Sequence, residues 1–234
     1  MLSARTAQLI ELTSIGESSI VKRGYARIMQ ADRRTRLTPD QRRAQLVSLG
    51  VASLADRPLE SLTIEYLSAA AGVSRGLLFH YFVSKKGLHR EVVRTARDSM
   101  LRATEPSPDL PPLERLRDTL TRIVQFVREH RGTFFSLVRG VASGDTEVRE
   151  VLEQARALQA QRVIAVFREL GIADSGLFRI ALRSWVAFAE EILVESALNT
   201  EMPSEEIVSF LERSVKAVAA SVYPANGRVP GAFG

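Results

Sequence analysis

The sequence has no cysteine, only three histidines and few aromatic residues, which make up 6% of its 234 positions. The absence of cysteine excludes disulfides, thiolate metal sites and cysteine nucleophiles, and it is typical of a protein in a reducing cytosol. No apolar run approaches the roughly 20 residues that a membrane-spanning helix needs. The N-terminus also lacks the apolar stretch and cleavage site of a signal peptide. We therefore expect a cytoplasmic protein with no membrane contact.

The residue patterns that mark most enzymes are missing as well. His80, His89 and His130 lack the i, i+4 spacing of metal ligands, and there is no glycine loop for phosphate and no nucleophile elbow. Ser19-Ile20-Val21-Lys22 fits Ser-x-x-Lys, but this pattern is common by chance and its companion motifs are absent. We therefore predict that the protein is not an enzyme and holds no cofactor or metal.

Charge is distributed unevenly along the chain, whose net charge is +5. Residues 1–104 carry 17 basic and 9 acidic side chains, whereas residues 105–234 carry 15 basic and 18 acidic ones. A polyanion that binds the N-terminal part explains this asymmetry, because lysine and arginine neutralise phosphates and release counterions. A chance imbalance of the surface stays open as the alternative.

Helix signals dominate and strand signals are nearly absent, which predicts an all-α protein. The first well-marked helix starts at Thr38-Pro39-Asp40-Gln41, where threonine can cap, proline suits the first helical position and glutamine completes a capping box. This helix should end near Asp56-Arg57-Pro58, because proline cannot continue it. Its apolar stripe is expected to consist of Leu46, Leu49, Val51 and Leu54.

Two short helices of about eight residues follow, joined by a tight glycine turn, and this arrangement predicts a helix-turn-helix. The first begins near Leu62, and the second begins at Ser74, which can cap it. Gly72 lies between them, where the end of a helix needs positive φ. A further helix after Ser84-Lys85-Lys86 should run to Met100 or Leu101, with Leu88, Val92 and Val93 facing inward.

Four prolines between residues 105 and 112 mark the clearest boundary in the chain, because proline cannot occupy a helix interior. We therefore divide the chain into a basic N-terminal extension (1–36), a helix-turn-helix domain (37–104), a proline-rich connection (105–112), a helical bundle (113–223) and a tail (224–234). The bundle should contain five amphipathic helices, over roughly 113–129, 131–142, 146–170, 174–199 and 204–222.

The second helix of the helix-turn-helix has the features of a helix that reads DNA, because it is short, held by apolar residues and polar near its N-terminus. Val73, Leu78 and Phe82 should face inward. Arg75 is the candidate base reader, since its planar fork matches guanine O6 and N7, and Gly76 allows close approach. The residues expected to meet DNA are Thr63, Ser74, Arg75, Gly76, Leu77, Phe79, His80, Tyr81 and Lys85, of which Thr63, Ser74, Tyr81 and Lys85 are assigned to phosphates.

Interpretations of the same residues without a role in DNA binding stay open. The three helices can be a packing unit without a role in recognition. His80 can be a solvated side chain, and Leu77 can pack against the preceding helix.

Residues 38–95 resemble the DNA-binding domain of the TetR family of regulators. The family pattern is Thr-x-x-x-(Ile/Leu)-Ala-x-x-Ala-Gly-Val-Ser-x-Gly-x-Leu-Tyr-x-(His/Tyr)-Phe-x-Ser-Lys, and the chain matches it at Thr63, Leu67, Ala71, Gly72, Val73, Ser74, Gly76, Leu78, Tyr81, Phe82, Ser84 and Lys85. Three positions depart from it. Ser68 replaces an alanine, a minor packing change, and Leu77 replaces a common threonine. Phe79 replaces a common tyrosine, which removes one hydroxyl–phosphate bond, so the operator sequence stays open.

The resemblance implies that residues 113–223 enclose a small-molecule pocket and form a dimer interface. By this resemblance the helices over residues 174–222 pair with their copies in a four-helix bundle. An apolar pocket suits a lipid-like or aromatic effector, and Arg131 and Arg139 either receive an anionic group or are solvated. The candidate ligand-binding residues are Phe126, His130, Phe134, Phe135, Trp185 and Phe188, and core packing stays open for each aromatic among them.

Together these features predict a ligand-responsive repressor that binds a palindromic operator on double-stranded DNA as a homodimer and is released by a small apolar or lipid-like effector. A constitutive or architectural DNA-binding protein without an effector is one alternative, and an activator is another. The basic segment Arg33-Arg34-Thr35-Arg36 is either a flexible arm for the minor groove or a solvated tail.

Overall fold

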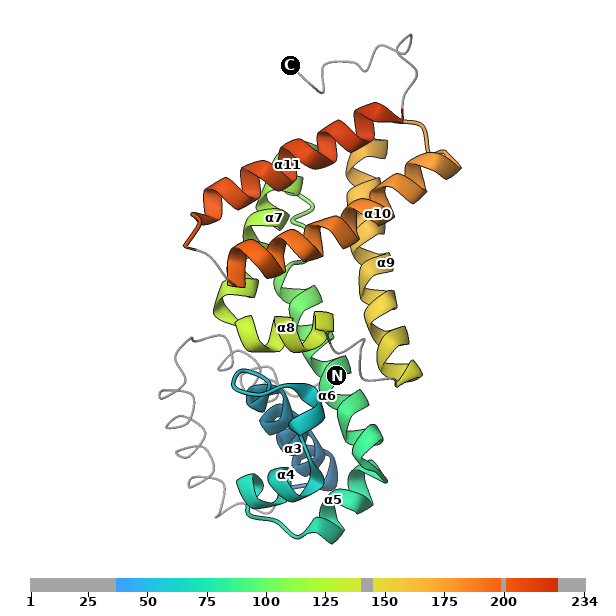
Figure 1. Cartoon of the computed structure of the whole chain (residues 1–234). Coiled ribbons are helices and arrows are strands. Elements are labelled where there is room, and N and C mark those ends of the chain that lie inside the picture. The colour runs from blue at the N-terminus through green and yellow to red at the C-terminus, as the bar shows by residue number, and fades with distance from the viewer. Residues whose placement is uncertain (1–36, 140–144, 199–200, 223–234) are drawn as a thin grey trace. The chain divides into compact units, whose positions relative to one another are not determined.

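The structure is a computed structural model that describes residues 37–139, 145–198 and 201–222 (Figure 1). Regular structure in these ranges is helical, without a strand, which confirms the predicted all-α class. The expected extension (1–36) and tail (224–234) lie outside the described residues. Each helix of the described ranges is too short or too polar to cross a lipid bilayer.

The chain divides into two compact units, and each is described by itself. Among the described residues, unit 1 comprises residues 37–99, 129–139 and 145–151, and unit 2 comprises residues 100–128, 152–198 and 201–222. Residues 129–139 and 145–151, which the sequence analysis assigned to the C-terminal bundle, fall in unit 1 together with the helix-turn-helix.

Unit 1 begins with α3 (Pro39–Ser53), whose start has the expected capping box. The Thr38 side chain accepts from the Gln41 backbone N–H (3.2 Å), and the Gln41 side chain accepts from the Thr38 N–H (3.0 Å). The helix ends at Ser53, slightly before the proline that was expected to stop it. Of the predicted stripe, Leu46 and Leu54 are buried, whereas Leu49 and Val51 are half-buried and Val47 and Gly50 take the inner positions.

A one-turn helix, η2 (Leu59–Ser61), leads into α4 (Ile64–Ala71), α5 (Arg75–Phe82) and α6 (Lys85–Ala103). The two short helices of eight residues each and the long helix behind them match the predicted helix-turn-helix. Leu88, Val92 and Val93 are buried on the inner face of α6, as predicted. Burial of such side chains stabilises the unit by roughly 1.5–3 kcal/mol each.

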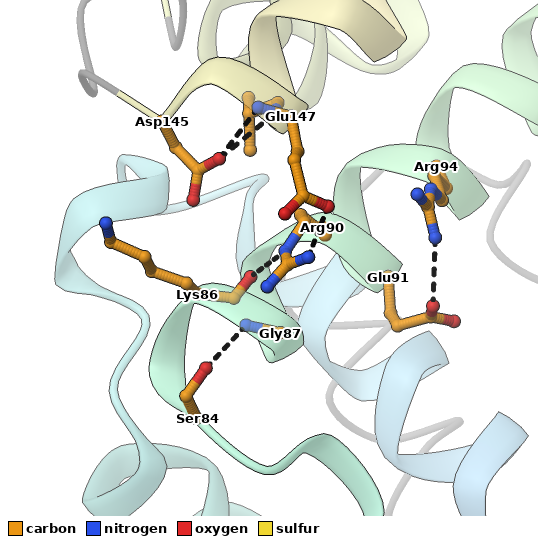
Figure 2. Close-up of polar contacts among 9 residues, drawn as sticks. Ser84, Lys86, Gly87, Arg90, Glu91, Arg94, Asp145 and Glu147 are labelled. Atoms are coloured by element: carbon orange, nitrogen blue, oxygen red, sulfur yellow. Dashed lines mark hydrogen bonds and ion pairs between the residues drawn. The ribbon is translucent and has the colours of Figure 1, made fainter.

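Residues 129–151 supply α8 (Arg131–Arg139) and the first turns of α9 (Thr146–Glu169) to unit 1. Gly132 lies so close to the end of α3 that a Cβ there would stand 2.2 Å from the Ala55 carbonyl oxygen. Figure 2 shows the second attachment, where the Arg90 guanidinium of α6 donates to the Glu147 carboxylate at the start of α9. Asp145 caps that start by accepting from the Glu147 N–H at 3.0 Å.

Unit 2 is built from α7 (Pro112–Glu129), the main part of α9, α10 (Gly176–Ile192), a π-helical turn (Leu193–Leu198) and α11 (Ser204–Ser221). With α8 these match the five predicted amphipathic segments, and residues 104–111 are not helical, as the prolines predicted. α10 and α11 lie side by side (Figure 1). Trp185 joins them, because its indole N–H donates to Ser214 Oγ at 2.9 Å.

Candidate nucleic-acid interface

The turn between α4 and α5 is fixed by backbone and side-chain hydrogen bonds. Gly72 ends α4 with φ 64° and ψ 35°, the left-handed conformation that glycine reaches without strain. The Val73 N–H donates to the Ser68 carbonyl (3.1 Å), and the Ser68 hydroxyl donates to the Val73 carbonyl (2.5 Å). Ser68 was interpreted above as a minor packing change. Its backbone carbonyl and its hydroxyl both form hydrogen bonds to Val73 across the turn.

Each of the two helices begins with a hydroxyl cap. Thr63 Oγ1 accepts from the Tyr66 N–H at 3.0 Å, and Ser74 Oγ accepts from the Leu77 N–H at 3.2 Å. A hydroxyl has one donor and two acceptor sites, so each cap uses an acceptor and keeps its own O–H available. Both hydroxyls are thus fixed in place at a helix N-terminus, where the helix dipole favours an anion.

α5 is amphipathic, and the side predicted to face inward is the buried one. Leu78 and Phe82 are buried, and Val73 is half-buried. The opposite face is exposed to solvent at five of the predicted DNA contacts, which are Ser74, Arg75, Gly76, Phe79 and His80. Leu77 and Tyr81 are half-buried, with the Tyr81 ring edge-on to His80 at 5.3 Å between centroids.

Two of the predicted basic contacts have partners within the chain. Arg75 Nη1 lies 3.7 Å from Glu65 Oε1 on α4, and both side chains are mostly exposed. Lys85 Nζ donates to the Glu60 carbonyl at 2.7 Å, at the start of α6. An ammonium has three donors, so this single bond anchors Lys85 without exhausting its capacity for phosphate.

The end of α5 is joined to the start of α6 by a strained turn. Val83 has φ 64° and ψ −41°, a region that β-branched residues avoid. The Ser84 N–H donates to the Phe82 carbonyl at 2.6 Å, which closes a γ-turn around Val83. The same carbonyl faces Gly87, where a Cβ would stand only 2.1 Å from its oxygen. The orientation of α5 relative to α6 therefore depends on this contact.

His89 connects α6 to the segment before α4. The ring is buried, and its Nε2 is 2.7 Å from the Leu62 carbonyl oxygen. Burial lowers the pKa of His89 and Lys85 lowers it further, whereas the hydrogen bond to Leu62 and the charges of Glu60 and Asp145 act in the opposite direction. The imidazole therefore favours its neutral form and donates its ring N–H to the carbonyl.

Comparison with known proteins identifies the family. The profile of the bacterial regulatory proteins of the tetR family matches residues 46–92, which contain the helix-turn-helix. The profile of the tetracyclin repressor-like C-terminal domain matches residues 112–218. The chain belongs to the TetR family. It is therefore a DNA-binding transcription regulator and not an enzyme, as predicted.

Relatives of this TetR-family chain include proteins named as transcriptional repressors. The HTH-type transcriptional repressor KstR2 of Mycolicibacterium smegmatis is 28% identical over 145 residues, covering 60% of this chain and 69% of that protein. KstR2 of Mycobacterium tuberculosis strain H37Rv is 29% identical over 93 residues, covering 39% of this chain and 46% of that protein. A solved tetR-family regulator from Streptomyces coelicolor is 25% identical, with a TM-score of 0.68 over 79% of this chain and 83% of that one.

A TetR-like regulator from Rhodococcus sp. RHA1 has a TM-score of 0.61 at 21% identity, over 79% of this chain and 97% of the other. This likeness supports the fold. The helix-turn-helix and the helical C-terminal part of the TetR architecture are thus present along the same chain.

The residues predicted for the effector of this TetR regulator fall in both units. In unit 2, Phe126 and Trp185 are buried, and Phe188 is exposed. In unit 1, Phe134 is buried, Phe135 is exposed, and burial lowers the pKa of His130 although Glu129 opposes the shift.

Phe188 packs against Phe210 of α11, with 6.0 Å between ring centroids, on the outer side of α10. Trp185 uses its only polar group, the indole N–H, in the hydrogen bond to Ser214. Two contacts of this TetR chain were not foreseen from the sequence, the Glu65–Arg75 pair and the Arg90–Glu147 pair. The hydroxyl caps, by contrast, could be predicted from local sequence, because their bonds span only three residues.

Proposed function

We propose that this TetR regulator is a ligand-responsive repressor that binds a palindromic operator as a dimer and leaves it when a small apolar effector binds. The repressors among its relatives support the direction of regulation. The observation that carries the DNA-binding part is the open face of α5, which begins with a fixed hydroxyl cap and the exposed Arg75.

In this proposal Arg75 reads a guanine in the major groove through its fork, and Gly76 lets the helix approach the duplex closely. Thr63 and Ser74 donate their hydroxyls to phosphates, because their acceptor sites already hold the helix N-termini. Lys85 and Tyr81 add phosphate contacts, and Leu77, Phe79 and His80 complete the face. Phosphate contacts fix the register, while Arg75 supplies the sequence preference.

Titration of operator and unrelated duplexes against two variants tests this assignment. Arg75→Ala should weaken specific binding by about 1–3 kcal/mol and relax discrimination at one base pair. Lys85→Ala should weaken binding to all duplexes alike and reduce the salt slope by about one. Operator discrimination that survives Arg75→Ala would show that another residue reads the base.

The dimer is proposed to form through α10 and α11. Large apolar side chains lie exposed along one side of α10, at Leu177, Ile180 and Phe188, and Phe210 continues the surface on α11. Exposed large apolar side chains grouped on one side of a helix mark an association site, and the exposed small residues Ala187 and Ala217 leave room for close helix approach. A dimer would place two recognition helices in successive major grooves, about 34–36 Å apart.

Light scattering across a dilution series tests the interface. Phe188→Asp should weaken self-association by about tenfold or more, because it places a charge in an apolar contact. Phe135→Asp is the matched control, since that exposed phenylalanine lies in unit 1 rather than on α10 or α11. Equal association of wild type and both variants would refute the proposed interface.

The effector response is proposed to act on α8 and the start of α9, which belong to unit 1 together with the helix-turn-helix. Ser136 Oγ donates to the Arg57 carbonyl at 3.5 Å, Gly132 touches Ala55, and Glu147 pairs with Arg90. A ligand that moves α8 therefore acts directly on the helix-turn-helix. The coupling is reciprocal, so operator binding changes the affinity for the ligand by the same factor. The lowered pKa of His130 favours a neutral imidazole, which suits a neutral polar group of the effector.

Gel shifts with the operator and a panel of fatty acyl and aromatic compounds test this response. With any compound that releases the operator, Glu147→Gln should change the concentration needed for half release, because it weakens the pair with Arg90. Glu150→Gln, an exposed carboxylate one turn further along α9, should leave that concentration unchanged. A protein that no compound releases would instead fit a constitutive DNA-binding factor.

A further inference from the structure

A carboxylate stands beside the proposed base reader, on the surface that is proposed to face DNA. Glu65 and Arg75 are 3.7 Å apart, with 62% and 67% of their side chains exposed. An exposed pair of this kind contributes little to folding stability. A free carboxylate here would repel phosphates and weaken DNA binding. Neither fold stability nor general DNA affinity therefore accounts for Glu65 at this position.

The backbone fixes the positions from which the two side chains extend. Glu65 is in the first turn of α4 and Arg75 is the first residue of α5, each directly behind a capped N-terminus. The turn that joins the helices is closed by the reciprocal Ser68–Val73 bonds. Because the helix starts cannot shift relative to one another, the carboxylate acts on the guanidinium from a fixed side.

We propose that Glu65 is a positioning and specificity-determining residue that orients Arg75 for a single base pair. This inference rests on the proposed function of Arg75 as base reader. Glu65 faces Nη1, so the Nη2 and Nε edge of the guanidinium is left for the two acceptors of guanine. Arginine has large rotamer freedom. A partner that restricts this freedom reduces the side-chain entropy that Arg75 loses when the protein binds DNA.

The pair is expected to matter more in the complex than in the free protein. Removal of water at the DNA surface lowers the local dielectric, and the attraction between carboxylate and guanidinium increases accordingly. Pairing with Arg75 also neutralises Glu65, which limits its repulsion of the phosphates. Glu65 thus lowers general affinity slightly while it sharpens the choice of base.

The test uses the full chain and the duplex that it selects from a random DNA pool. Dissociation constants are measured for that duplex, for versions with each half-site base pair replaced, and for an unrelated duplex. The proteins compared are wild type, Glu65→Gln, Arg75→Ala, the double variant and Glu60→Gln. The last removes the same charge from an exposed carboxylate in η2 of the same unit.

Glu65→Gln should reduce discrimination at the base pair read by Arg75 by about three- to tenfold, a part of the full value of a bidentate contact. Its binding to the unrelated duplex should stay equal or become tighter, as with Glu60→Gln. In the Arg75→Ala background, Glu65→Gln should leave discrimination unchanged, because the residue acts through Arg75.

Two results would overturn the inference. Equal effects of Glu65→Gln and Glu60→Gln on the dissociation constants at every base pair would mean that Glu65 acts only through its charge. A loss of discrimination by Glu65→Gln that persists without Arg75 would make Glu65 a direct reader, since a carboxylate can accept from cytosine N4. A wild-type protein without sequence preference, by contrast, would refute the proposed function itself.

Discussion

Replacement of Gly87 by alanine tests how the recognition helix α5 is attached to α6. The added Cβ would stand 2.1 Å from the Phe82 carbonyl oxygen and 3.2 Å from its carbonyl carbon. Both atoms are backbone, so no side-chain rotation relieves the overlap. The helices must separate by roughly 1 Å or bend, because carbon and oxygen atoms in contact lie more than 3 Å apart.

Two opposing terms set the size of the effect. Overpacking of this kind costs about 1–3 kcal/mol, whereas alanine in place of glycine in a helix gains about 0.5–1 kcal/mol. We expect a net loss of about 1–2 kcal/mol, which lowers Tm by roughly 2–8 °C for a chain of this size. Operator affinity should fall too, because a displaced α5 no longer fits the groove.

Gly76 provides the matched control. A Cβ at Gly76 would have Ser74 Oγ as its nearest neighbour, at 3.9 Å, which is an ordinary contact. Gly76→Ala should therefore raise stability by about 0.5–1 kcal/mol. It should still weaken operator binding, since Gly76 is proposed to lie against the DNA.

Thermal and urea unfolding followed by circular dichroism measure the two stabilities, and fluorescence anisotropy of labelled operator measures the two affinities. Gly87→Ala that is as stable as wild type would refute the close contact with Phe82. Gly76→Ala that binds operator as tightly as wild type would place Gly76 away from the duplex. The two variants together separate damage to the fold from damage to the DNA-binding face.

Three further predictions concern single contacts. Val83→Gly should stabilise the protein by up to about 1 kcal/mol in urea unfolding, because relief of positive-φ strain of about 1–2 kcal/mol exceeds the added chain entropy; a lower midpoint would contradict the strain. The pKa of His89 is lowered in the folded state, so its contribution to stability is full above about pH 6.5 and is lost as the pH falls through the folded pKa. His89→Gln should flatten that part of the stability profile, and an unchanged profile would exclude His89. Trp185→Phe should lower the free energy of unfolding by about 1–3 kcal/mol, because it removes the hydrogen bond to Ser214. A smaller decrease would mean that water replaces the lost bond.

Features that depend on neighbouring residues were predictable. The capping box at Thr38, the hydroxyl caps at Thr63 and Ser74 and the turn at Gly72 each follow from residues within a few positions of one another. Residues 105–111 of the proline-rich connection are not helical, since proline cannot occupy a helix interior. The family pattern depends on these local elements, so the sequence was sufficient to recognise it.

The inner face of α3 was predicted only in part. The apolar positions Leu49 and Val51 fit a helical stripe, yet Val47 and the small Gly50 take the inner positions. Gly50 meets Val92 of α6 so closely that a Cβ would stand 2.5 Å from its methyl group. Which side of a helix is buried depends on the partner that packs there, and the partner is far away in the sequence.

The helix-turn-helix was determined by the sequence alone, because its caps, glycine turn and apolar spacing are local. The tertiary structure decided three things that local pattern does not contain. It brought Glu65 to Arg75, placed residues 129–151 with the DNA-binding unit, and put Phe188 on an exposed surface beside Phe210. These contacts join residues from 10 to more than 50 positions apart, and their formation depends on how the helices pack.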